Sequence, residues 1–169
     1  MGTDSSGQQV NDSGAAGVIA RPIRLFPAAL LLGLVLDHLL PLPAAIPRTG
    51  LVHWIGATLA GELILIGIAI FAAGVRNFTR AATPLPTNQP ARMLVTTGIH
   101  GWTRNPIYLG FFLMYVGVGV VVHSPWILAL TIPVAVAIRY GVVAREEAYL
   151  ERRFGGAYRD YKVRVRRWL

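Results

Sequence analysis

Residues 94–108 read LVTTGIHGWTRNPIY, and the chain turns apolar directly after them, with LGFFLMYVGVGVVV at residues 109–122. The first stretch contains groups that apolar segments lack, among them a histidine, an arginine and the pair Asn105-Pro106. Proline is favoured in the first turn of a helix. The boundary therefore predicts a membrane helix that begins near Pro106, with polar residues where the chain enters the membrane.

The whole chain has the composition of an integral membrane protein. Of its 169 residues, 54% are hydrophobic and 14% are charged, whereas a soluble domain carries about 25% charge. The net charge of +8 comes largely from basic residues beside apolar segments, so we attribute it to membrane topology and anionic lipid and expect no nucleic-acid partner. The chain has no cysteine and no histidine pair with metal-ligand spacing, and we expect no metal site.

Four apolar segments predict an all-α, polytopic membrane helical bundle with a further C-terminal helix in the cytoplasm. We expect the transmembrane spans at about residues 23–42, 52–75, 107–122 and 126–140. Only His123-Ser-Pro separates the last two, and each is short for a lone span of about 20 residues. They are expected to form either a tight hairpin or one kinked, re-entrant pair.

Polar segments flank the spans. Residues 1–20 are small and polar and predict a disordered tail, which leaves residues 21–169 as one membrane domain. After residue 139 the chain is strongly basic, and REEAYLERRF predicts a helix that ends at Gly155. By the positive-inside rule, both termini and residues 77–106 lie in the cytoplasm of what we expect to be a bacterial inner membrane.

The motif Arg104-Asn105-Pro106-x-Tyr108 is the first candidate for chemistry. Asn105 is expected to cap the helix, whose N-terminus suits a carboxylate or a phosphate. Arg104 adds a bidentate anion binder. The alternative is a capped span whose arginine reaches lipid headgroups.

The acids Glu146 and Glu147 are the second candidate, because they interrupt a basic segment next to the membrane. A carboxylate there can stabilise a cationic ligand. The alternative is a solvated helix face on which Glu147 pairs with Arg152 or Arg153.

Two acids fall inside the predicted spans, Asp37 and Glu62. An ionisable group inside a membrane span costs free energy, so the default hypothesis is that it has a function. We favour a structural cluster with His38, His53 or Arg48, because the other candidate residues all lie on the cytoplasmic side.

The order and spacing of the two motifs resemble the isoprenylcysteine carboxyl methyltransferase family, which belongs with the phospholipid methyltransferases. The resemblance covers residues 83–169 and rests on LVTTGIHGWTRNPIYLG followed by REEAYLERRFGGAYRDYKVRVRRW. It implies S-adenosylmethionine as cofactor, a lipophilic small molecule or lipid as acceptor, and a site built from residues 94–108 and 139–161. The implied cofactor-binding residues are Gly98, His100, Arg104, Asn105, Pro106, Tyr108, Glu146 and Glu147.

Arg104, Arg139 and Glu147 are the implied catalytic residues. Methyl transfer is an in-line displacement that needs a positioned acceptor. A carboxylate acceptor needs an arginine to orient it and no base, whereas an amine or thiol would need a base such as Glu146, Glu147 or His100. We favour carboxyl methylation. Methylation of an ethanolamine phospholipid or a small thiol is the alternative, and a non-catalytic membrane scaffold is the alternative from another class.

The match is imperfect at three positions. Ile99 and His100 replace the proline and the aromatic residue that are frequent in the family, and Asn105 stands where eukaryotic members have histidine. The last difference argues against a histidine base at that position.

Overall fold

The structure is a computed structural model that describes residues 22–43, 48–84 and 90–169; the predicted tail at residues 1–20 lies outside this part. The α-helices are α1 (Pro22–Leu39), α2 (Gly50–Arg80), α3 (Pro106–Val121), α4 (Pro125–Ile138), α5 (Ala144–Phe154) and α6 (Gly156–Arg164). A 3-10 turn, η1 (Gly98–Gly101), precedes α3, and a π-helical turn, η2 (Arg139–Val143), joins α4 to α5. The described residues form no strand, and the prediction of an all-α membrane helical bundle is confirmed.

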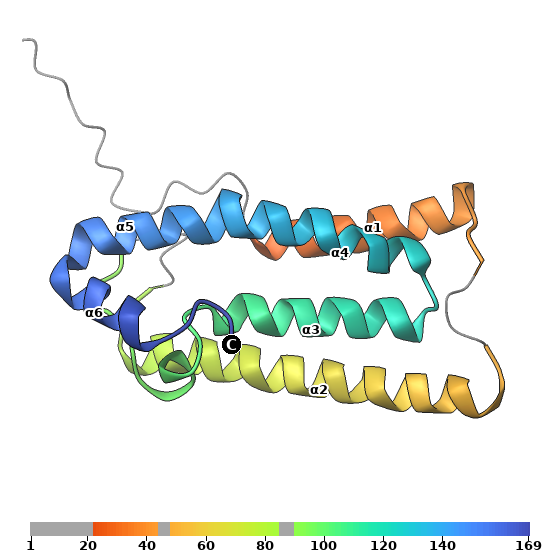
Figure 1. The fold of residues 1–169 in the computed structure, drawn as a ribbon, viewed down its shortest axis with the longest axis horizontal. Coiled ribbons are helices and arrows are strands. Elements are labelled where there is room, and N and C mark those ends of the chain that lie inside the picture. The colour runs from red at the N-terminus through yellow and green to blue at the C-terminus, as the bar shows by residue number, and fades with distance from the viewer. Residues whose placement is uncertain (1–21, 44–47, 85–89) are drawn as a thin grey trace, which may run out of the picture.

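The long helices lie side by side, as Figure 1 shows. α2 forms one edge and packs along α3, while α4, η2 and α5 run on as a single helix beyond α3, with α1 against α4. α3 and α4 are neighbours joined by a tight turn. Of the two arrangements expected, a tight hairpin or one kinked, re-entrant pair, this is the hairpin. Ser124 starts α4 by accepting a hydrogen bond from the Ile127 amide at 2.9 Å.

Glycines bring α2 and α3 into close contact. A Cβ atom on Gly67 would lie 2.8 Å from the carbonyl oxygen of Gly110, and one on Gly110 would lie 2.6 Å from that of Gly67. Ala60 and Gly117 meet in the same way, since a Cβ on Gly117 would be 2.9 Å from the Ala60 carbonyl oxygen. Small residues that let backbones approach are typical of helix packing in membranes.

Among the described residues, three helices are long and apolar enough to cross a membrane: Pro22–Leu39, Gly50–Arg80 and the continuous Pro125–Phe154, while α3 is a shorter apolar helix. The chain is an integral membrane protein. At about 1.5 Å per residue, α2 is roughly 47 Å long and exceeds a hydrocarbon layer of about 30 Å. The helices therefore continue past the expected spans 52–75 and 126–140, because hydropathy detects only the part of a helix that lies in lipid.

Aromatic side chains fill the core where α1, α3 and α4 meet. Phe26 is 3% exposed and stacks on Phe111 with ring centroids 5.0 Å apart. Tyr115 is 2% exposed, and its ring lies edge-on to Phe26. This packing holds α3 in place and so fixes the residues at its start.

The expected cluster around Asp37 and Glu62 does not form. His53 instead lies against His123, with Nδ1 and Nε2 3.2 Å apart. Neither acid has a hydrogen bond or an ion pair within the described part of the chain. Glu62 is exposed on the side of α2 that faces away from α3.

Candidate functional site

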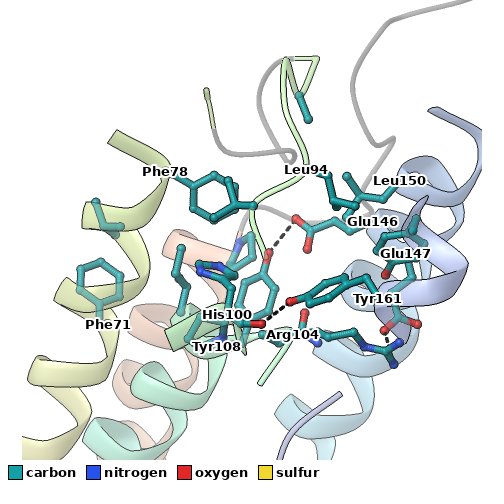
Figure 2. A pocket seen from close by; sticks show the side chains of 18 of the residues that line it. Phe71, Phe78, Leu94, His100, Arg104, Tyr108, Glu146, Glu147, Leu150 and Tyr161 are labelled. Atoms are coloured by element: carbon teal, nitrogen blue, oxygen red, sulfur yellow. Dashed lines mark hydrogen bonds and ion pairs between the residues drawn. The ribbon is translucent and has the colours of Figure 1, made fainter. Parts of the chain in front are cut away.

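A pocket opens at the end of the bundle where the segment before α3 meets α5 and α6 (Figure 2). One wall is polar and the other apolar. The polar wall contains seven of the eight predicted cofactor-binding residues, namely His100, Arg104, Asn105, Pro106, Tyr108, Glu146 and Glu147. Two segments about 40 residues apart in the chain thus come together as predicted.

Two buried acids from α5 form the centre of the polar wall. Glu146 is 8% exposed and accepts a 2.8 Å hydrogen bond from the Tyr108 hydroxyl. Glu147 is 7% exposed and lies 3.0 Å from Nη2 of Arg104. The alternative of a solvated face that pairs within the helix is therefore wrong.

Arg167 is a second partner of Glu147 that the sequence did not single out. Its Nε donates to Oε1 at 2.9 Å and its Nη2 to Oε2 at 2.6 Å. In sequence Arg167 is one of several basic residues near the C-terminus, a pattern that indicated topology alone. Only the return of the chain to α5 distinguishes it from its neighbours.

Arg104 carries an unsatisfied donor. Its Nε is buried and finds no hydrogen-bond partner among the described residues. Since buried polar groups are nearly always paired, such a donor in a pocket wall fits an anionic ligand. A carboxylate is the match that forms charge-assisted hydrogen bonds with a guanidinium.

Asn105 takes the N-cap position of α3 without the capping hydrogen bond that was predicted. Its Nδ2 donates instead to the carbonyl oxygen of Arg167 at 3.0 Å. The prediction of a side-chain cap was wrong: the bond from Nδ2 to a carbonyl oxygen 62 residues away fixes the orientation of the amide group, and Oδ1 makes no capping bond. Pro106 is the first helical residue, as predicted.

Gly98 lies outside the pocket lining and shapes the turn behind it. Its φ is +59°, a left-handed conformation that favours glycine, and a Cβ there would lie 2.6 Å from Nδ2 of Asn77. Asn77 in turn donates to the Thr97 carbonyl oxygen at 2.7 Å. The glycine therefore permits α2 to contact the loop that carries His100 and Arg104.

His100 is 4% exposed and is held by three contacts. Its ring lies edge-on to Phe78 at 5.0 Å, its Nδ1 is 3.3 Å from Asn77 Nδ2, and its carbonyl oxygen accepts a 2.6 Å bond from the Tyr161 hydroxyl. Burial lowers the pKa of His100 to about 4. The imidazole is thus neutral near pH 7 and only a weak base.

Arg139 is not among the residues that line the pocket. Its guanidinium carbon lies 5.5 Å from the centroid of the Tyr140 ring. Arg139 begins the π-helical turn η2, whose wider turn changes the phase of the helix between Arg139 and the acids of α5. The seven-residue spacing from Arg139 to Glu146 therefore does not give the common face that a regular helix would.

The apolar wall comes from the ends of three membrane helices. It contains Ile23 of α1, Phe71, Val75 and Phe78 of α2, and Phe111 of α3. Ile23 is 68% exposed, so this wall continues to the outer surface of the bundle. Sequence analysis missed these residues, because an apolar side chain in a span gives no sign that it faces a pocket.

Comparison with known proteins identifies the family. Residues 54–157 match the sequence model of the phospholipid methyltransferase family. The protein-S-isoprenylcysteine O-methyltransferase of Rattus norvegicus is 32% identical over 128 residues, which cover 70% of this chain and 42% of that protein. The enzyme of the same name from Saccharomyces cerevisiae is 36% identical over 73 residues, 43% of this chain and 30% of the relative. An uncharacterized protein of Haemophilus influenzae is 67% identical over 27 residues, 16% of this chain and 43% of that protein.

The chain spans less than half the length of each of these relatives. No solved structure matches it. The family match covers more than half of the chain and includes most of the pocket, and it confirms the resemblance inferred from the two motifs. On this basis the chain belongs to the phospholipid methyltransferase family.

Proposed function

We propose that this protein transfers a methyl group from S-adenosylmethionine to the carboxylate of a lipophilic acceptor. The observation that carries the proposal is the pairing of an unsatisfied, buried arginine donor with two acids on one wall and an apolar wall opposite. The first wall suits a zwitterionic cofactor, and the second suits an acceptor delivered from lipid. The names of the curated relatives favour a carboxyl acceptor.

The polar wall offers separate partners for the two charges of an amino acid. Arg104 Nε would bind the carboxylate of the methionyl group. Both oxygens of Glu147 are already engaged by arginines. Glu146, which accepts a hydrogen bond from the neutral Tyr108 hydroxyl, is therefore the acid that would face the ammonium or the sulfonium.

When bound, S-adenosylmethionine supplies an electrophilic methyl group on a sulfonium sulfur. The task of the chain is to hold the acceptor atom close to that methyl group and in line with it. Arg104 is the arginine in the pocket that would orient an acceptor carboxylate as well as the cofactor. A carboxylate acceptor is already a nucleophile, so the low pKa of His100 is no obstacle to this reaction.

N-methylation of an ethanolamine phospholipid is the second candidate, since the matching family is named for phospholipid methylation. An amine acceptor must lose a proton. Glu146 is a carboxylate in the pocket that could receive it, whereas His100 is too weak a base near neutral pH.

Methyl transfer in lipid nanodiscs tests the proposal. The purified chain receives S-adenosylmethionine with a labelled methyl group and one of three acceptors: N-acetyl-S-farnesylcysteine, an ethanolamine phospholipid or an alkyl thiol. We expect base-labile label on the farnesylated carboxylate and its loss in Arg104→Ala. Label only on the phospholipid amine or the thiol would replace the favoured acceptor. No transfer to any acceptor, with no binding of S-adenosylhomocysteine, would favour a non-catalytic scaffold.

We also propose that the pocket faces the cytoplasm of a bacterial inner membrane, with both termini on that side. The distribution of basic residues supports this orientation. Because the chain has no cysteine, single substitutions can be labelled without background. In spheroplasts, an impermeant maleimide should label Leu51→Cys and leave Asp160→Cys unlabelled until lysis; the opposite result would invert the topology.

A further inference from the structure

Residues 165–169 form a strap that contacts the start of α3 and α5 beside the candidate site. Thr103 Oγ1 and Asn105 Nδ2 both donate to the carbonyl oxygen of Arg167, at 3.2 and 3.0 Å. Trp168 packs edge-on against the ring of a phenylalanine in α3. The backbone of the strap is therefore fixed against the start of α3 by contacts that do not need the Arg167 side chain.

The Arg167 side chain reaches from the strap to α5. Its two nitrogens bind the two carboxylate oxygens of Glu147 in the forked arrangement that arginine and carboxylate prefer. Arg104 reaches the same carboxylate through Nη2 alone, at 3.0 Å. Arg167 thus occupies the bidentate position, and Arg104 has the remaining contact.

The way the two arginines share the Glu147 carboxylate explains why Arg104 has a free donor. A single contact with Glu147 leaves Nε of Arg104 buried and without a partner in the described part of the chain. The local charge also matters. The Glu147 carboxylate and its two guanidinium partners carry a net charge of +1 between them, which favours an anion at Arg104, whereas Glu147 with Arg104 alone would carry none.

We propose that Arg167 is a positioning residue that keeps Arg104 available to the carboxylate of the cofactor by holding Glu147 in a two-bond arrangement. The inference rests on the proposed function, because the anionic ligand is the methionyl carboxylate of S-adenosylmethionine. Without the Arg167 guanidinium, the Glu147 carboxylate turns to Arg104, forms the forked pair with it and cancels its charge. Arg104 then no longer binds an anion, although the pocket persists.

Two ligands that differ in the carboxylate separate this role from a structural one. S-adenosylhomocysteine carries the amino-acid group, and 5′-methylthioadenosine has the same nucleoside and thioether without it. Calorimetry on the full chain in nanodiscs should show that Arg167→Ala weakens S-adenosylhomocysteine at least tenfold and changes 5′-methylthioadenosine by less than twofold. Arg167→Lys, which keeps the charge but loses the fork, should give an intermediate loss and supplies a second variant if the alanine form does not fold.

Arg164→Ala is the matched control, because this arginine is exposed and its Nε donates to the backbone oxygen of Asp160 in its own helix. It should bind both ligands like the parent. In turnover, Arg167→Ala should raise the KM for S-adenosylmethionine at least tenfold and leave kcat at saturation within about threefold.

The outcomes distinguish the inference from the function on which it rests. Equal weakening of both ligands in Arg167→Ala, or no weakening of either, would overturn the positioning role while the proposed function stands. A parent protein that binds neither ligand would overturn both.

Discussion

Glu146 and Glu147 are adjacent in sequence and equally buried, yet we expect their glutamine variants to fail in different ways. Glu147→Gln should mainly destabilise the fold, because this carboxylate joins two arginines. Glu146→Gln should mainly impair the reaction, because Glu146 is bonded to the neutral Tyr108 hydroxyl and is the acid left for a cationic ligand.

The expected sizes follow from the exposure of each partner. Both side chains of the Arg104–Glu147 pair are 9% exposed, and breaking a buried pair by removing one partner costs about 3–5 kcal/mol. The Arg167 side chain is 28% exposed, so solvent limits its contact with Glu147 to at most about 1 kcal/mol. Glutamine retains one acceptor oxygen, which leaves a loss of about 3 kcal/mol. In Glu146→Gln the hydroxyl keeps an acceptor, and the loss is about 1 kcal/mol or less.

Thermal unfolding in nanodiscs, followed by circular dichroism, measures the difference. For a chain of this length about 3 kcal/mol corresponds to a decrease in Tm of roughly 6–12 °C, against at most about 4 °C for Glu146→Gln. In turnover at permissive temperature, Glu146→Gln should lose at least about tenfold in kcat/KM. The reasoning is refuted if Glu146→Gln unfolds at the lower temperature of the two, or if Glu146→Gln retains parental kcat/KM.

Three further changes test other features. Burial lowers the pKa of His100 from 6.5 to about 4. The neutral ring therefore contributes about 3 kcal/mol to the free energy of unfolding above pH 6.5, and this contribution is lost as the pH falls towards 4. Chemical unfolding of His100→Gln between pH 7 and 5 should show a smaller loss of unfolding free energy than the parent; parallel curves would contradict this. Glu62→Leu should raise unfolding free energy in a bilayer by about 2 kcal/mol, because an ionisable side chain that faces hydrocarbon is costly; a lower stability would mean that the acid has a partner in the membrane. Gly98→Ala should cost roughly 1–2 kcal/mol, since its left-handed φ and the Asn77 amide leave no room for a methyl group, and a parental Tm would show that the loop adapts.

The sequence was sufficient to predict the parts of the fold that depend on local pattern. Apolar runs reflect the solvent that each segment meets, so the four apolar segments coincide with α1, α2, α3 and α4, although only three helices in the described part of the chain are long and apolar enough to cross a membrane. Pro106 marked the start of α3 because a proline at that position costs no hydrogen bond. The family motifs likewise identified seven residues that line one pocket, although they lie in two distant segments.

The features that were missed depend on contacts between distant residues. Asn105 was expected to cap its own helix, but its Nδ2 donates to a carbonyl oxygen of the C-terminal strap and its Oδ1 makes no capping bond. Arg167 looked like any other basic residue until the strap returned to α5. The π-helical turn η2 has no distinct residue pattern, and Arg139 at its start lies outside the pocket lining although the family resemblance implied a catalytic role for it.

A single continuous helix, Pro125–Phe154, connects the membrane-spanning part of the bundle to the pocket, so a movement of the one moves the other. Its 30 residues give a rod roughly 45 Å long, of which one end lies in lipid and the other carries Glu146 and Glu147. A tilt of about 5° about the far end would move those acids, which lie roughly 33 Å from it, by about 3 Å, roughly the length of a hydrogen bond. Since helices tilt to match bilayer thickness, the thickness of the bilayer would itself affect the geometry of the pocket.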